Sequence, residues 1–246
     1  MTAPPGAPTT TLAKAPEVLL GAPRADSFTA FGRRVDIWVA EIGAPPGAGR
    51  LRSGELLSRA DAERAARIAA PGGRARFTGG RALARWVLAV RLGCLPAEVP
   101  IVTGPGGRPE LAGGGRSPAH GQASERIDFN VSHSGNQVAV VLARGLRVGI
   151  DIERVVERDS AADVADRVFS VAERELLRRT PRAAYPARWY RIWTTREAYV
   201  KARGTGLSGI TADLPALGTS WLAHGVRGVP RDYAATAVAC RTDPRV

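Results

Sequence analysis

Apolar segments spaced along the chain predict a set of short strands. RVDIWVAEI at 34–42 alternates between apolar and polar residues, which is the period of a half-buried strand. We also expect a short strand entering a turn at 101–111 and a closing hairpin from 219–224 and 233–241. Three more strands, separated by tight turns and therefore expected to be antiparallel neighbours, are FNVSH (129–133), QVAVVLA (137–143) and VGIDIERV (148–155).

Apolar positions three to four residues apart predict helices in both halves of the chain. Ser170 and Glu173 form a capping box at the start of one of them. PGG at 71–73 is expected to separate the first two helices. Strands and helices fall into successive groups, which favours an α+β fold over a doubly wound sheet. The expected helices span 58–70, 75–92, 160–168, 171–179 and 183–203.

The strand at 148–155 carries two carboxylates on one face. Val148, Ile150 and Ile152 share one side of the strand, so Asp151 and Glu153 share the other. Two like charges at this spacing repel, and burial would favour protonation of one of them. A bound cation would relieve this repulsion.

The helix at 183–203 adds a third carboxylate and a lysine. Glu197 and Lys201 are four residues apart and lie on one helical face. Such a pair is most often a surface ion pair worth a few tenths of a kcal/mol. Here, however, only Lys14 and Lys201 are lysines among 35 basic residues, which favours a role that needs an ammonium group. Three carboxylates without a Cys/His cluster suit Mg²⁺ or Mn²⁺ better than zinc.

Charge and composition narrow the class of protein. The net charge is +12, and residues 59–91 alone carry +6, which suggests an anionic partner such as nucleic acid, an acidic protein or a phosphorylated small molecule. No apolar run approaches the roughly 20 residues of a membrane span, and no signal-peptide pattern opens the chain. Cys94 and Cys240 offer no disulfide framework. We therefore expect a soluble, cytoplasmic protein.

Four motifs in order resemble one enzyme family. FNVSHSG, VGIDIE, FSVAERELL and WTTREAYVKARGTGLS are similar to motifs of the surfactin-type 4′-phosphopantetheinyl transferases, which have a V-G-[IV]-D-x-E strand, an F-[ST]-x-x-E segment and a W-[TS]-x-K-E-[AS]-x-x-K helix. The matches span residues 129–208, with fainter similarity at 57–92 and 105–110. Arg196 and Arg108 stand where the family usually has lysine.

The resemblance implies a reaction and a set of site residues. The family transfers the phosphopantetheine arm of coenzyme A to a serine of an apo acyl or peptidyl carrier protein and releases 3′,5′-ADP. Asp151, Glu153 and Glu197 match the acidic residues that hold Mg²⁺ against the pyrophosphate. Glu197, directly or through water, also matches the candidate base, and Lys201 a residue that assists proton transfer or neutralises phosphate. Residues matching or lying near coenzyme A contacts are Ser132 and His133 (phosphates and adenosine), Arg108 (nucleotide), and Arg64, Arg67 and Arg81 (3′-phosphate and nucleotide).

The resemblance also implies an architecture. We expect two similar α+β halves related by a pseudo-twofold axis, with the active site at their junction. The N-terminal half, 34–143, would grip the nucleotide, and the C-terminal half, 144–246, would hold the metal. Residues 1–33, rich in Pro, Ala, Gly and Thr, are expected to form a mobile tail. A monomer acting on acidic carriers of polyketide or nonribosomal peptide biosynthesis is expected, without a nucleic-acid or membrane partner.

Two other function classes stay open on the residues alone. A nucleic-acid-binding module would explain the arginines of 59–91, but base stacking uses exposed aromatics, and this segment has only Phe77 and Trp86. DNA binding with steep salt dependence would favour it. A metal-dependent phosphate-ester hydrolase would use the same three carboxylates and would release phosphate products without an acceptor protein.

Overall fold

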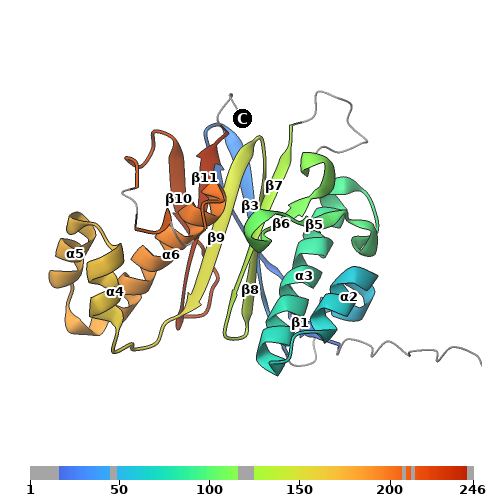
Figure 1. The fold of residues 1–246 in the computed structure, drawn as a ribbon, viewed down its shortest axis with the longest axis horizontal. Coiled ribbons are helices and arrows are strands. Elements are labelled where there is room, and N and C mark those ends of the chain that lie inside the picture. Colours follow the sequence, from blue (N-terminus) through green and yellow to red (C-terminus); the bar gives the residue numbers. More distant parts are fainter. Residues whose placement is uncertain (1–16, 45–48, 116–124, 207–208, 212–213, 243–246) are drawn as a thin grey trace, which may run out of the picture.

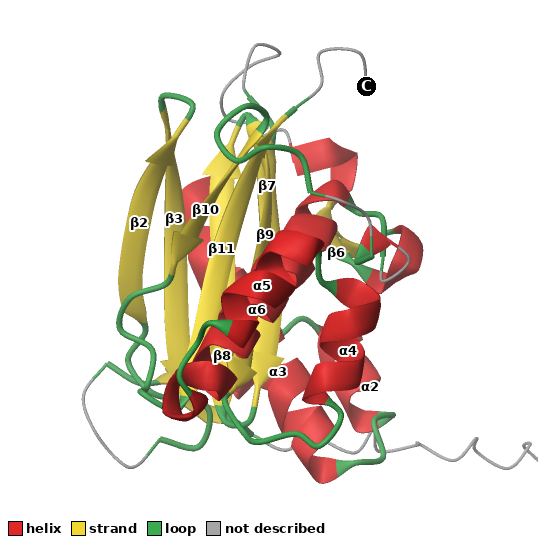
Figure 2. Ribbon diagram, turned by 90° about the vertical axis from the view of Figure 1, so that its left-hand side faces the viewer, coloured by secondary structure: helices red, strands yellow, loops and turns green. Residues whose placement is uncertain are grey.

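The computed structural model describes residues 17–44, 49–115, 125–206, 209–211 and 214–242. Two antiparallel sheets pack against each other, and a long helix covers the outer face of each (Figure 1). Figure 2 shows the second of these helices lying across the strands of its sheet. The α+β fold class predicted from the sequence is thereby confirmed. Within the described ranges, no helix combines the length and hydropathy needed to cross a bilayer.

The first sheet has the strand order β2-β3-β8-β7. Helix α3 (Pro71–Leu92) packs on its outer face. Along β8, Val138 and Val140 face this helix, whereas Ala139 and Val141 face the second sheet. Because β8 is buried on both faces, its sequence is a continuous apolar run instead of an alternating one. The strands are β2 (Arg24–Ala30), β3 (Arg33–Glu41), β7 (Ile127–Ser134) and β8 (Gln137–Arg144).

The second sheet has the order β10-β11-β9, and helix α6 (Tyr185–Arg203) packs on its outer face. Gly149 allows the close approach of helix and strand, because a Cβ there would lie 2.0 Å from the carbonyl oxygen of Ala198. The strands are β9 (Leu146–Arg154), β10 (Trp221–Gly225) and β11 (Tyr233–Arg241), the last two forming the predicted hairpin.

Short elements complete the fold around the two long helices. Ser170 and Glu173 form the predicted capping box at the start of α5. The short helices are α1 (Ser53–Leu56), α2 (Arg59–Ala66), α4 (Ala161–Val168) and α5 (Val171–Arg178). The short strands are β1 (Leu19–Leu20) with β4 (Leu51–Arg52), and β5 (Ile101–Thr103) with β6 (Pro109–Leu111); 3₁₀ turns lie at Pro96–Glu98, Pro105–Gly107, Ala112–Gly115 and Arg182–Ala184.

Three sequence-based expectations are wrong in detail. Strand β9 does not pair with β8; it joins the other sheet, and Gly145, at φ +67°, lies between the two strands where the chain passes from one sheet to the other. Part of the predicted tail is ordered, because Arg24–Ala30 form the edge strand β2. Most of these residues are not buried, so the strand has no clear alternation of apolar and polar residues. Residues 1–16 lie outside the described part. The first two helices are separate, as expected, but the break lies at 67–70 and PGG opens α3. Pro71 takes the first helical position, where its missing N–H costs nothing.

Strands β7 and β9 meet at the junction of the two sheets through side chains. Every second residue of β7 turns its side chain to β9 and accepts a backbone N–H from it. The bonds run from Val148 to Asp128 (2.8 Å), Ile150 to Asn130 (3.1 Å), Ile152 to Ser132 (3.4 Å) and Arg154 to Ser134 (3.2 Å). This polar seam brings two segments 20 residues apart into a constant register.

Candidate active site

Acidic and basic groups from β9 and α6 meet beside the polar seam. The face of β9 opposite the inter-sheet core carries Asp151 and Glu153, as the alternation predicts. Lys201 Nζ lies 2.6 Å from Asp151 Oδ1 and 4.0 Å from Glu197 Oε2. The structure therefore brings Lys201 to two of the three predicted carboxylates.

Two serines of β7 hold the carboxylates from the other side. Ser132 Oγ donates to Asp151 Oδ1 at 2.9 Å and accepts from Lys201 Nζ at 3.2 Å. Ser134 Oγ donates to Glu153 Oε2 at 2.7 Å. Ser134 was not among the predicted site residues, although its spacing of two from Ser132 already places both on one face of the strand.

Burial raises the pKa of two of the three carboxylates, Glu153 and Glu197. The pKa of Glu153 is raised, mainly by desolvation and further by the charge of Asp151, while the hydrogen bond from Ser134 opposes the shift. The pKa of Glu197 is also raised by desolvation; Lys201 opposes this, and Asp151 and Glu153 add to it. Loss of hydration therefore makes both carboxylates harder to ionise in the metal-free protein.

The donor chemistry of this cluster fits a hard cation. Asp151 Oδ2 is buried and has no hydrogen-bond partner among the described residues, so one carboxylate oxygen is available as a ligand. The described His, Cys, Asp and Glu residues form no ready-made group of three ligands, and Lys201 holds the other oxygen of Asp151. Mg²⁺ commonly binds through one or two carboxylates plus substrate phosphates and water, so a preformed cage is not required.

A small basic pocket lies on the α3 side of β7. Its volume is about 170 Å³. The guanidinium groups of Arg64 and Arg81 lie 5.3 and 5.6 Å from the ring centroid of Phe77. Arg81 is 7% exposed, and its Nη1 is buried without a partner among the described residues. His133 also lines the pocket; its pKa is lowered by partial desolvation and by the nearby positive charges of Arg76 and Lys201. We call this the arginine pocket.

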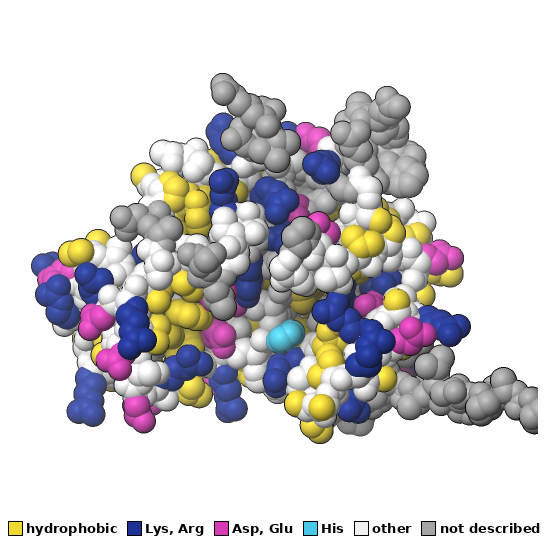
Figure 3. All heavy atoms as spheres, in the orientation of Figure 1, with side chains coloured by type: hydrophobic (Ala, Val, Ile, Leu, Met, Phe, Trp, Pro, Cys, Tyr) yellow, Lys and Arg dark blue, Asp and Glu magenta, His cyan; other side chains and the backbone are white. Residues whose placement is uncertain are grey.

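A larger hollow of about 620 Å³ continues from the arginine pocket to the acidic cluster. Both are lined by Gly107, Pro109 and Val131, so they form one groove along β6 and β7. Glu197 and Lys201 line its far end. Lys and Arg side chains gather on both sides of the strip between α6 and α3 (Figure 3).

Two predicted nucleotide contacts lie away from the arginine pocket. Arg67 is exposed at the end of α2 and does not line the pocket. Arg108 Nη2 donates to both oxygens of Asp128 at 2.9 Å and to the backbone carbonyls of Phe129 at 3.0 Å and Val148 at 3.1 Å. Its Nη1 donates to the backbone carbonyl of Lys201. Arg108 thus points at the junction of the sheets and at α6, and it lines the larger hollow instead of the arginine pocket.

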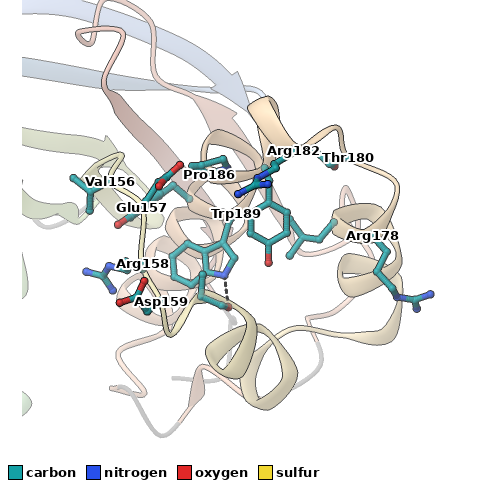
Figure 4. Close-up of a pocket in the computed structure, with 13 residues that line it drawn as sticks. Val156, Glu157, Arg158, Asp159, Arg178, Thr180, Arg182, Pro186 and Trp189 are labelled. Carbon is teal, nitrogen blue, oxygen red and sulfur yellow. Dashed lines mark hydrogen bonds between the residues drawn. The ribbon is translucent and has the colours of Figure 1, made fainter.

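A third pocket, of about 440 Å³, lies beyond the end of β9 among α4, α5 and the first turns of α6 (Figure 4). Trp189 forms its centre, with Nε1 donating to the carbonyl of Ala161 at 2.9 Å. Tyr190 Oη is buried there without a partner among the described residues. Arg158 at the rim is close enough for its charge to lower the pKa of Glu153. This pocket therefore adjoins the acidic cluster.

Comparison with known proteins identifies the family. A family model described as the 4′-phosphopantetheinyl transferase superfamily matches residues 147–227, which include Asp151, Glu153, Glu197 and Lys201. The 4′-phosphopantetheinyl transferase HetI of Nostoc is 32% identical over 191 residues, covering 76% of this chain and 75% of HetI. The chain belongs to the 4′-phosphopantetheinyl transferase superfamily.

Other members of the superfamily support the same assignment. A protein of Synechocystis that is provisionally named a 4′-phosphopantetheinyl transferase is 31% identical over 175 residues, which cover 70% of this chain and 66% of that protein. The transferase AcpT of Salmonella typhi is 39% identical over 97 residues, or 39% of this chain and 50% of AcpT. The predicted function, phosphopantetheinyl transfer to a carrier protein, is confirmed at the level of the family. Neither the nucleic-acid-binding module nor the hydrolase is supported.

Proposed function

We propose that this chain is a surfactin-type, Mg²⁺-dependent transferase that moves the phosphopantetheine arm of coenzyme A to a serine of an apo acyl or peptidyl carrier protein. One observation carries the proposal: a single groove has at one end Arg81, whose buried Nη1 has no partner among the described residues, and at the other end Glu197 and Lys201. Asp151 lies behind Lys201, with its Oδ1 2.6 Å from Lys201 Nζ. The length and polarity of such a groove suit a nucleotide with a phosphate at one end and a reactive pyrophosphate at the other.

The arginine pocket would bind the nucleotide end of coenzyme A. Arg81 offers an unpaired N–H group in a desolvated place, where a charge-assisted bond to phosphate is strong. Arg64 and His133 line the same pocket and would contact the 3′-phosphate and the adenosine. Ser132 lies one residue from His133 and reaches toward the acidic cluster, where the pyrophosphate would lie.

Asp151, Glu153 and Glu197 would hold Mg²⁺ or Mn²⁺ against the pyrophosphate. When bound, the ion supplies positive charge that stabilises the phosphoryl group during attack. Lys201 Nζ lies 2.6 Å from Asp151 Oδ1, and its remaining N–H groups could donate to a phosphate oxygen. Ser134 keeps Glu153 directed to the same place.

Glu197 is the proposed base for the acceptor serine. In the metal-free protein, desolvation raises the pKa of Glu197, and this favours its action as a proton acceptor. The serine oxygen attacks the phosphorus that bears the pantetheine, the bond from this phosphorus to the 3′,5′-ADP oxygen breaks, and the serine proton passes to Glu197 directly or through water. Lys201 would neutralise charge on the departing phosphate.

The carrier would approach from the side of the third pocket. Arg158, Arg178 and Arg182 line it, and Val156 at its edge is 46% exposed (Figure 4). An acidic carrier surface with an apolar side chain near its serine would fit these groups and the +12 net charge of the chain. We further propose that the enzyme works as a cytoplasmic monomer on carriers of polyketide or nonribosomal peptide synthesis.

Intact-mass spectrometry tests the proposal directly. The protein is incubated with coenzyme A, Mg²⁺ and several apo carriers; we expect each competent carrier to gain one phosphopantetheine unit as 3′,5′-ADP forms. A carrier whose acceptor serine is replaced by alanine should gain nothing, and EDTA should stop the reaction. Absence of both the mass gain and 3′,5′-ADP across the carriers would refute the proposed function.

A further inference from the structure

The last carbonyls of α6 are bonded by arginine side chains from outside the helix. The final four carbonyls of any helix have no partner within it. In α6, the N–H of Gly204 satisfies Val200 at 2.9 Å. The next two are taken by Arg108, which donates to the carbonyl of Lys201, and by Arg147, whose Nε donates to that of Ala202 at 3.3 Å. Both cations also complement the negative end of the helix dipole.

Arg108 differs from Arg147 in where it comes from. It lies directly after the turn Pro105–Gly107 that joins β5 and β6, and its chain neighbours Gly107 and Pro109 line the arginine pocket. Its own side chain is 10% exposed and crosses to β7, β9 and α6. One residue therefore joins the wall of the nucleotide pocket to the helix end that carries Lys201.

We propose that Arg108 is a positioning residue for the transfer reaction: it fixes the end of α6, and with it Glu197 and Lys201, relative to the bound nucleotide. This inference rests on the proposed function. Arg108 also lines the larger hollow, but its Nη1 and Nη2 donate to protein acceptors, and we therefore assign it to alignment. A guanidinium suits this role because its fork reaches acceptors on three elements at once. A lysine at this position could donate to only some of these acceptors, because its three N–H donors are all on one nitrogen.

The test separates alignment from nucleotide binding. Arg108→Ala is compared with wild type in kcat for carrier modification and in the dissociation constant of 3′,5′-ADP measured by titration calorimetry. We expect kcat to fall about 10- to 100-fold, as small misplacements of reacting groups do, while 3′,5′-ADP binding changes by less than about twofold. Guanidinium ion added to Arg108→Ala should restore part of kcat, and methylammonium should not. Arg34→Ala removes an exposed arginine of β3 paired with Asp36 and serves as the matched control.

Hydrogen exchange gives a readout that does not depend on activity. Amides in the last turn of α6 should exchange faster in Arg108→Ala than in wild type or Arg34→Ala. Arg108→Lys, which keeps the charge and part of the bonding, should fold even if the alanine variant does not, and should show a smaller loss of kcat. An unchanged kcat, or a loss confined to 3′,5′-ADP affinity, would overturn the assignment. A wild-type protein that transfers nothing would instead refute the proposed function, while the exchange and binding data would still test the link.

Discussion

Replacement of Arg81 by methionine should cost affinity for one particular phosphate. Arg81 is buried in the arginine pocket, and its Nη1 has no partner among the described residues. A ligand phosphate would supply that partner. A hydrogen bond to a charged group contributes about 1.5–3 kcal/mol, so the loss corresponds to a roughly 10- to 150-fold weaker coenzyme A complex.

The structure indicates that Arg81→Met will still fold. Asp61, which lies 3.5 Å from Arg81 Nε, also pairs with Arg85 and so keeps a cationic partner. Methionine fills much of the space of the arginine stem, and the change removes a buried donor that lacks a partner. We therefore expect the free energy of unfolding to change by less than about 1 kcal/mol.

Calorimetric titration with coenzyme A and with dephospho-coenzyme A, which lacks the 3′-phosphate, isolates the contact. Wild type should prefer coenzyme A, and Arg81→Met should lose that preference while binding dephospho-coenzyme A as before. Arg67→Met is the control, because Arg67 is exposed outside the pocket and should affect neither ligand by more than about twofold. Equal weakening of both ligands, or none, would refute the contact between Arg81 and the 3′-phosphate.

Three further changes probe the site and its framework. Asp151→Ala should lower transfer at least about 100-fold while circular dichroism stays native, because it removes the partner of Lys201 and the free oxygen Oδ2; retained activity by intact mass would contradict the metal assignment. Glu197→Gln should abolish transfer yet raise the melting temperature of the metal-free protein at pH 8. The pKa of Glu197 is raised in the folded protein, so its ionised form destabilises the fold at high pH. The gain in melting temperature from glutamine should therefore vanish as the pH falls through the ordinary glutamate pKa of 4.5. A gain that does not depend on pH would contradict this reasoning. Gly149→Ala should destabilise by roughly 3 kcal/mol or more in chemical denaturation, since its Cβ would lie 2.0 Å from a backbone oxygen of α6, and a neutral effect would mean that helix and strand are less closely packed.

Much of the acidic end of the site could be predicted from residue spacing in the sequence. Side chains alternate along a strand and recur every fourth residue along a helix, so the pairs Asp151 with Glu153 and Glu197 with Lys201 follow from spacing alone. The same alternation on β7 places Ser132 and Ser134 on one face, and both bond to carboxylates of β9. Residue spacing alone did not predict that β7 and β9 lie side by side.

The positions of the arginine side chains, by contrast, could not be predicted from spacing. Arg67 and Arg81 have the same charge and similar helical surroundings in the sequence, yet only Arg81 lines the pocket. An arginine side chain is long and has many rotamers, so its end point depends on neighbours that the fold supplies. Arg108 illustrates this further, because its acceptors come from residues as distant as Lys201.

The sequence by itself determined most helices and strands, the α+β class and the order of motifs that marks the superfamily, because these depend on short-range periodicity and residue type. Tertiary structure decided which sheet β9 joins, which arginines face the groove, and that Arg108, directly after the turn between β5 and β6, bonds to the end of α6. Those features depend on pairings between residues far apart in the sequence, such as Arg108 and Lys201 at 93 positions, and no local pattern encodes them.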